Sequence, residues 1–198
     1  MGLKDFLKEI QTKAKEQDDL MRRRMPVIAG QIAVSHFKEN FQKSGFIDNG
    51  LHKWQPSKRI GKEKGAAGKN KTLLSGRDHL FSSISYIPGD YAVLIKNDVP
   101  YASIHNEGGP VSINPTVTPK MKKFAWAKYY EALNGKKPGK NTSIPEDAAR
   151  WRALALTKKS KLSIKYVMPK RQFIGESKEL NDKLTNKLDL ELEKIWNL

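Results

Sequence analysis

The sequence predicts an α+β fold: a small, mainly antiparallel sheet packed by a long N-terminal helix and a C-terminal helix, with an inserted helical segment. Three observations lead to this class. Apolar residues recur every three or four positions near both ends of the chain. Short runs in the middle alternate between apolar and polar residues, as in strands. Two basic, Gly-containing stretches, 57–72 and 134–144, interrupt these patterns and are expected to be loops.

Two helices are predicted at the N-terminus. The first covers residues 3–20, and the second begins at Pro26, a residue suited to a first helical turn, and ends near Gln42. Asp18 and Asp19, at the end of the first helix, lead into Met21 and the basic triplet Arg22–Arg24. We therefore predict an N-terminal helical extension at 1–24 and a single domain at 25–198. The stripe of the first helix is Leu3, Phe6, Ile10 and Ala14, and that of the second includes Ile28, Ile32, Phe37 and Phe41.

Residues 45–72 are expected to be irregular, with a turn at 48–50. Residues 57–72 carry six basic side chains against one acid, which predicts a mobile loop. This loop and the stretch 134–144 are expected to order only on contact with a partner. The basic residues of the loop are Lys58, Arg59, Lys62, Lys64, Lys69 and Lys71.

The remaining elements follow from periodicity. Residues 73–84 predict a short helix or turn, residues 91–97 and 111–118 predict strands, and residues 161–168 predict a further strand. Helices are expected at 120–133 and 145–156, inside a helical insertion at 119–158. A last helix begins near Ser177, and its stripe is Leu180, Leu184, Leu188, Leu192 and Ile195.

Composition limits the function classes. The net charge is +16, which favours acidic partners such as nucleic acid, an acidic protein or an anionic membrane. The absence of cysteine excludes disulfides and thiolate metal sites, and it fits a reducing cytoplasm. No apolar run approaches the roughly 20 residues that span a bilayer, and MGLKDFLKEI lacks the apolar core of a signal peptide. No membrane partner is expected.

Catalytic patterns are weak. The chain has four histidines, and no two stand four residues apart as a helical zinc pair requires. A serine nucleophile elbow and a Walker loop are both absent. His105 and Glu107 could serve a hydrolase, but no other acid or nucleophile accompanies them in the sequence. We therefore expect no enzyme activity, no cofactor and no metal.

Four stretches instead occur in an order that resembles a known family. They are DNGLHKWQP at 48–56, LLSGRDHLFSSI at 73–84, YASIHNEGG at 101–109 and MPKRQFIG at 168–175. Together they resemble the phage virion morphogenesis family, the Mu-like tail completion proteins, over about residues 25–195. The residues that carry the resemblance or could form an interface are Trp54, Pro56, Leu74, Gly76, Leu80, Ser83, Tyr101, His105, Glu107, Gly108, Gly109, Pro169, Arg171, Phe173 and Gly175.

The resemblance implies a structural protein and not an enzyme. It implies a bacteriophage or prophage protein at the neck or tail end of the virion, assembled in the cytoplasm of the host bacterium and needed for tail completion and head–tail joining. Its partners would be other copies in a closed ring, six-fold by the tail symmetry of the wider class, the tail tube or tail terminator, and the head connector. Non-specific contact with packaged DNA also fits this reading.

Under this resemblance the stretch YASIHNEGG is a folded turn. Gly108 and Gly109 allow backbone angles that a Cβ forbids, and Tyr101 and Ile104 could anchor the turn in the core. The side chains of His105 and Glu107 are expected to form hydrogen bonds that hold the loop, with Arg171 or Trp54 as partners. A neighbouring subunit is the other candidate partner for Arg171, and a simple surface position is the third alternative.

A basic nucleic-acid-binding module is the alternative function. Lys158, Lys159, Lys161, Lys165, Lys170 and Arg171 fall within 158–171 with no acid among them. Such a cluster could contact phosphates in a salt-sensitive manner, although no nucleic-acid-binding motif accompanies it.

Overall fold

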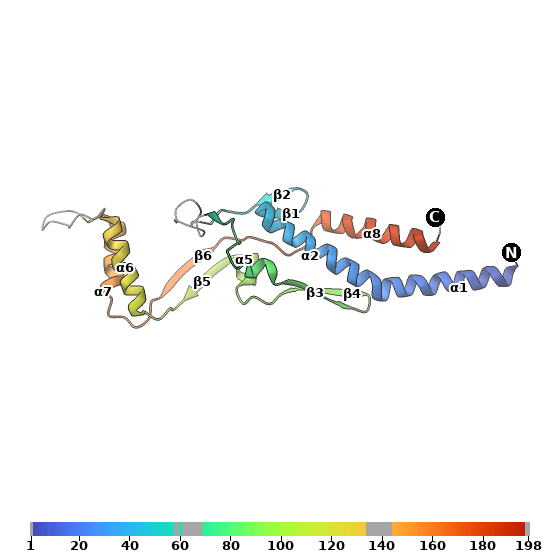
Figure 1. Ribbon diagram of the computed structural model, residues 1–198, viewed down its shortest axis with the longest axis horizontal. Coiled ribbons are helices and arrows are strands. Elements are labelled where there is room, and N and C mark those ends of the chain that lie inside the picture. The colour runs from blue at the N-terminus through green and yellow to red at the C-terminus, as the bar shows by residue number, and fades with distance from the viewer. Residues whose placement is uncertain (1, 58–59, 61–68, 134–143, 197–198) are drawn as a thin grey trace. The chain divides into compact units, whose positions relative to one another are not determined.

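The computed structural model describes residues 2–57, 60, 69–133 and 144–196 of the chain. It divides into two compact units, a larger unit of Met1–Gly109 with Met168–Leu198 and a smaller unit of Pro110–Val167. The α+β class is confirmed (Figure 1). The strands of the described ranges pair as three two-stranded sheets. The single domain expected at 25–198 is therefore two units, and the N-terminal extension 1–24 falls within the larger one.

The N-terminal helices are continuous, contrary to the expected separation. α1 (Leu3–Asp19) passes into a π-helical turn, η1 (Leu20–Arg24), and then into α2 (Met25–Lys43). Pro26 explains the wide turn, because proline has no N–H and its ring clashes with the carbonyl four residues earlier. That carbonyl belongs to Arg22, and it accepts a hydrogen bond from the Tyr91 N–H at 3.1 Å. The π turn thus exchanges a helical hydrogen bond for a tertiary one.

Two hairpins pack near α2. β1 (Gly45–Ile47) pairs antiparallel with β2 (Leu51–Lys53), and β3 (Ile84–Gly89) pairs antiparallel with β4 (Ala92–Asn97). The sequence predicted only β4. β1 and β2 have three residues each, too few to show an alternating pattern, and they lie in a region expected to be irregular.

The β3–β4 hairpin packs along α2 in Figure 1. The approach is close at Gly30, where an added Cβ would lie 2.1 Å from the ring of Tyr86. The tip of the hairpin reaches the π turn, where Asp90 pairs with Arg22 at 2.6 Å. The hairpin is thus tied to the helix at both its side and its tip.

The core of the larger unit is built around Phe41 of α2. Its ring meets those of Trp54, Phe81 and Phe173 at centroid distances of 5.5, 5.8 and 5.1 Å. Four segments that are distant in sequence therefore share one aromatic cluster. The buried residues of the cluster are Ala33, Phe37, Phe41, Phe46, Trp54, Leu80, Ile84, Ala102, Phe173 and Leu180.

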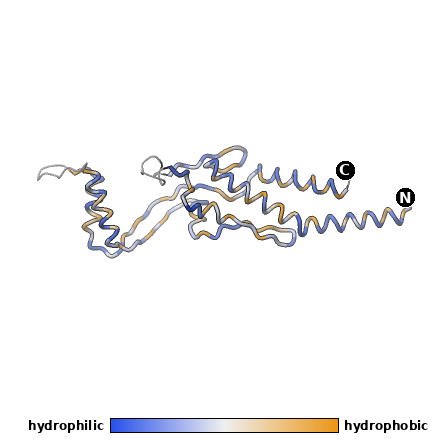
Figure 2. The backbone as a smooth tube through the Cα atoms, viewed as in Figure 1, coloured by the Kyte–Doolittle hydropathy of each residue, from blue (hydrophilic) through white to orange (hydrophobic). Residues whose placement is uncertain are grey.

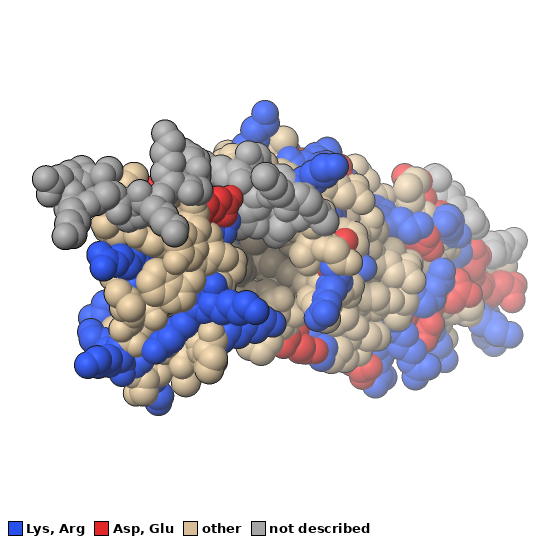
Figure 3. Space-filling view, turned by 60° about the vertical axis from the view of Figure 1, so that its left-hand side comes forward, with Lys and Arg blue, Asp and Glu red and all other residues tan. Residues whose placement is uncertain are grey.

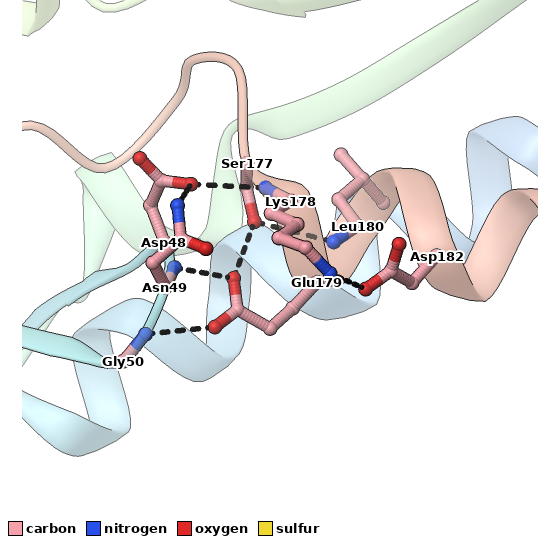
Figure 4. Close-up of polar contacts among 8 residues, drawn as sticks. All are labelled: Asp48, Asn49, Gly50, Ser177, Lys178, Glu179, Leu180 and Asp182. Carbon is pink, nitrogen blue, oxygen red and sulfur yellow. Dashed lines mark hydrogen bonds and ion pairs between the residues drawn. The ribbon is translucent and has the colours of Figure 1, made fainter.

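The N-terminus of α8 (Lys178–Trp196) is capped by the β1–β2 turn (Figure 4). Ser177 acts as the N-cap, since its hydroxyl accepts from the Leu180 N–H at 3.2 Å. Asp48 accepts from the Lys178 N–H at 3.0 Å, and the Glu179 carboxylate accepts from the N–H groups of Asn49 and Gly50 at 3.0 and 2.8 Å. Turn and helix satisfy each other's free N–H groups, which fixes where the last helix begins.

The α1 helix has no buried residue in this structure. Figure 2 shows orange apolar positions recurring along it, in agreement with the predicted stripe. Leu3, Phe6 and Leu7 are all at least half exposed. An exposed apolar stripe of this kind is typical of a helix that packs against another protein.

The smaller unit contains β5 (Gly109–Ile113), α6 (Pro119–Ala132), α7 (Glu146–Leu156) and β6 (Ile164–Met168), of which β5 pairs with β6. The predicted insertion thus extends beyond 119–158 to include both strands. α6 and α7 pack through small residues, with Ala125 and Ala148 fully buried. Phe124 and Trp151 meet edge to face at 5.8 Å.

None of the helices within the described ranges is long and apolar enough to cross a membrane. The expected partner-dependent ordering of 57–72 and 134–144 concerns stretches that lie mostly outside the described residues, as do Lys58, Arg59, Lys62 and Lys64.

A cluster of charges joins α8 to the π turn and provides a test of this packing. The buried carboxylate of Glu191 contacts Lys187, Lys194 and Arg24 at 2.7, 2.8 and 3.2 Å. The hydrogen bonds from Lys187 and Lys194, together with the charges of these two lysines, lower the pKa of Glu191 from 4.5 to about 2. Because the folded pKa is depressed, the stability from this group is complete above pH 4.5 and is lost as pH falls toward 2.

We therefore expect Glu191→Gln to lower the thermal unfolding midpoint at pH 7, with a deficit that shrinks as pH falls from about 5 to 2. Thermal melts followed by circular dichroism across this pH range test the prediction. Glu193→Gln is the matched control, because Glu193 is exposed on the same helix and forms no ion pair with a described residue. Equal, pH-independent deficits in both variants would contradict this role of Glu191.

Candidate functional site

The first and third stretches of the sequence resemblance form hydrogen bonds with residues 169–175 of the fourth, the segment PKRQFIG between β6 and α8. The second stretch packs in the same core through Leu80. This segment is neither helix nor strand, so its backbone polar groups need partners from elsewhere. The Gln172 carbonyl accepts from the Trp54 indole N–H at 2.8 Å, and the Phe173 carbonyl accepts from the Asn40 amide at 3.1 Å. The Arg171 N–H donates to the His105 carbonyl at 2.8 Å.

The side chain of Asn106 forms two hydrogen bonds with this segment through a single atom. Its amide oxygen accepts from the N–H groups of both Phe173 and Ile174, at 2.9 and 3.0 Å. Asn106 lies on α5 (Ala102–Glu107), a short helix within YASIHNEGG. The sequence offered one signal for it, because Asn is a poor residue for a helix interior unless its side chain has a partner.

Asn40 is the second residue that sequence reasoning missed. It is fully buried on α2, where its amide oxygen also accepts from the Ile47 N–H at 3.1 Å. The available signal was an amide on the same helical face as Phe37 and Phe41, since an amide buried among such residues requires hydrogen-bond partners. Asn40 thus connects the β1 strand to the segment 169–175.

The two glycines of YASIHNEGG have different roles. Gly108 has φ +70°, and a Cβ there would lie 2.6 Å from the Lys170 backbone nitrogen. Gly108 therefore permits both the turn and the close approach of residues 169–175. Gly109 has φ +115° with open space around it. Glycine is favoured there because of the backbone angle, and not because a side chain would clash.

The expected side-chain contacts of this stretch are wrong in three respects. Arg171 does not pair with Glu107, which is exposed and instead accepts from the Asn106 amide at 2.5 Å. The His105 ring does not bond to Arg171 or Trp54, and its Nδ1 is buried with no partner in the described part of the chain. Tyr101 is 46% exposed, and Ala102 occupies the core position in its place. The helical turn directs the His105 carbonyl toward Arg171, and the contact is made by the backbone.

Arg171 is buried rather than on the surface. Its side chain is 7% exposed, and its Nε–H donates to the Gln55 carbonyl at 2.9 Å. Nη1 lies 3.7 Å from the Met168 sulfur. Burial lowers the pKa of Arg171, and burial together with the charge of Arg171 lowers the pKa of His105, which favours neutral imidazole.

The other predicted residues mostly form the surrounding frame. Trp54 is buried against Phe41, Leu80 and Phe173 are buried in the same cluster, and Leu74 packs at its edge. Ser83 ends the short helix α4 (His79–Ser82). Pro56 is exposed, Pro169 is half-buried beside Arg171, and Gly76 has open space around it. An added Cβ at Gly175 would lie 2.1 Å from the end of the flexible Gln172 side chain, which can move aside.

A cavity of about 240 Å³ lies where the stretches meet. Its lining comes from or adjoins all four of them, with Ser57 after the first, Leu80 in the second, His105 in the third and Arg171 in the fourth. None of the described residues that line it is Asp or Glu, so this part of the chain supplies the cavity with no carboxylate to serve as a general base.

The described residues hold no group of three or more His, Cys, Asp or Glu side chains that could bind a metal ion. What the site can do chemically is donate hydrogen bonds and present one buried positive charge.

Comparisons with protein families, with curated proteins and with solved structures find no match to this chain. The assignment of a function therefore depends on the geometry and on the motifs alone.

Removing the Asn106 amide tests the organisation of the site. Asn106→Ala leaves two partly buried N–H groups without an acceptor and should lower the free energy of unfolding by about 2 kcal/mol. Chemical denaturation followed by tryptophan fluorescence measures this, since Trp54 reports on the same segment. Asn181→Ala, at an exposed position of α8, is the control and should change stability little. An Asn106→Ala variant as stable as the wild type would show that the amide does not hold the segment.

Proposed function

We propose that the chain is a structural protein of a tailed bacteriophage or prophage, acting at the tail end or neck to complete the tail and join it to the head. The observation that carries the proposal is the set of hydrogen bonds by which the first and third stretches hold residues 169–175 of the fourth, while Leu80 of the second packs in the same core. Contacts such as Asn106 to Phe173 and Trp54 to Gln172 hold a surface in shape, whereas a catalytic site would direct its polar groups at a substrate.

The exposed apolar side chains support an assembly role. Those of α1 lie along one helix of the larger unit, and Phe124, Tyr130 and Leu156 are more than half exposed in the smaller unit. Apolar surface of this extent usually marks contacts with other chains. A closed ring of identical subunits is the arrangement that we propose, because repeated head-to-tail contacts that close give a ring.

Loss of the protein should separate heads from tails. In a phage genome that carries this gene, a nonsense codon early in the gene should give DNA-filled heads and unjoined tails in electron micrographs of the lysate. Purified protein added to that lysate should restore joined particles. Normal particles without the protein would contradict the proposal.

Nucleic-acid binding is the second candidate function, and the smaller unit favours it. The sequence of 110–167 has 13 basic and 3 acidic residues, so this unit carries +10 of the net charge of +16. Figure 3 shows blue Lys and Arg side chains outnumbering red acidic ones on the part of the surface nearest the viewer. Exposed aromatic side chains such as Tyr130 and Tyr166 accompany the charge, a combination suited to phosphate contact and base stacking.

If the smaller unit binds nucleic acid, reversing the charge at Lys158, Lys159 and Lys161 should weaken DNA binding and reduce its salt dependence. If the three lysines bind phosphates, the slope of log K against log salt should fall by roughly 0.9 for each phosphate that is no longer neutralised. Fluorescence anisotropy with a short labelled duplex at several salt concentrations measures both quantities.

The matched control reverses Lys4, Lys8 and Lys15 on α1, which changes the net charge equally in the larger unit. Equal reductions of binding in the two triple variants would mean that net charge alone attracts DNA. No binding by the wild type at low salt would remove the nucleic-acid candidate.

A further inference from the structure

The cavity at the meeting point of the four stretches contains an unusual charge. Arg171 lines it and is 7% exposed, yet no carboxylate among the described residues forms an ion pair with it. Buried arginines are nearly always paired, because an unpaired charge loses hydration without compensation. Burial is the cause that lowers the pKa of Arg171, and no acidic group offsets it.

The Arg171 guanidinium also has more N–H donors than partners among the described residues. It carries five N–H groups, of which one donates to the Gln55 carbonyl and one approaches the Met168 sulfur at 3.7 Å. Nη2 makes no hydrogen bond to any described residue. At the wall of the cavity, the guanidinium of Arg171 therefore keeps N–H donors that bond to no described residue.

The other lining groups suit an anion with an apolar stem. His79, Thr72 and Tyr101 supply polar groups, and Leu80 contributes an apolar wall. Among the described residues, no acid lines the cavity and Arg171 contributes a positive charge, so the electrostatic field of these lining residues is positive. An entering anion would meet no negative charge from the described lining residues and would neutralise the buried charge.

The volume of the cavity and the burial of Arg171 indicate which kind of anion could bind. About 240 Å³ lies below the range of roughly 300–1,000 Å³ that holds a drug-sized ligand, so a single side chain is a better match. A phosphate on duplex DNA is held on a rigid backbone and is contacted mainly by exposed side chains, whereas Arg171 is buried. A carboxylate on a flexible stem can reach inward and accept two parallel hydrogen bonds from a guanidinium.

We propose that this cavity is a docking site for a carboxylate-bearing residue of an acidic segment of a partner protein, with Arg171 as the group that binds the carboxylate. The chain's charge of +16 favours such a partner at long range. The proposal goes beyond the structural role in the virion and does not depend on it, because it rests on the cavity and on Arg171 alone.

A peptide pair tests the site directly. The probes are acetyl-Gly-Leu-Glu-Leu-Gly-amide and the same peptide with Gln in place of Glu, titrated into the full chain labelled with nitrogen-15. We expect the Glu peptide to shift the Arg171 Nε–H resonance saturably, and the Gln peptide to bind at least tenfold more weakly. No shift by the Glu peptide at 20 mM, or equal shifts by both peptides, would overturn the proposal.

Three variants identify the binding group. Arg171→Lys keeps the charge but loses the fork and should bind the Glu peptide at least fivefold more weakly. Lys170→Gln removes the neighbouring exposed charge and should bind as the wild type does. His79→Glu places a carboxylate among the lining residues while retaining Arg171, and it should abolish peptide binding without unfolding the chain. Because His79 is exposed, this variant keeps the test decisive if Arg171→Lys fails to fold.

Inorganic phosphate and a 12-base-pair duplex are titrated under the same conditions. The proposal predicts that neither shifts the Arg171 Nε–H resonance below the concentration at which the Glu peptide saturates it. A stronger response to phosphate or to DNA would overturn the carboxylate assignment and identify the cavity as a phosphate site.

Discussion

The fold of the larger unit depends on one constraint, that the seven residues 169–175 cross the core without forming a helix or strand. Backbone N–H and C=O groups in such a position must find partners one by one. Asn106 supplies an acceptor for two of them, Trp54 and Asn40 supply donors, and the His105 carbonyl supplies another acceptor. These bonds determine where α2, α5 and the loop after β2 must lie, and the Phe41–Trp54–Phe173 cluster fills the space between them.

The two units differ in what they offer to a partner. The larger unit combines a hydrogen-bonded core with an exposed apolar stripe on α1 and, at a cavity, a buried arginine that forms no ion pair with a described residue. The smaller unit has a core of a few small and aromatic side chains and carries most of the net charge. A chain with surfaces of such different chemistry is suited to contact several kinds of neighbour, as a protein that joins two parts of a particle must do.

Periodicity predicted the long elements well, because a helix such as α8 shows its apolar stripe over many turns. It failed where structure depends on distant partners. The π turn exists because Pro26 releases the Arg22 carbonyl and the distant Tyr91 N–H donates to it, which no local pattern contains. The motifs drew attention to this region, and within it the titratable residues His105 and Glu107 were favoured. The neutral Asn106 between them makes the contacts, and the burial of Arg171 follows only from the tertiary fold.

The proposed role requires the chain to assemble, and the mass of the protein in solution shows whether it does. Light scattering behind a sizing column should be measured at two salt concentrations, with and without purified tails from the same host lysate. We expect a discrete, closed oligomer, which forms either from the protein alone or only when tails are present to direct its assembly. A protein that remains monomeric in every condition and elutes apart from the tails would contradict it.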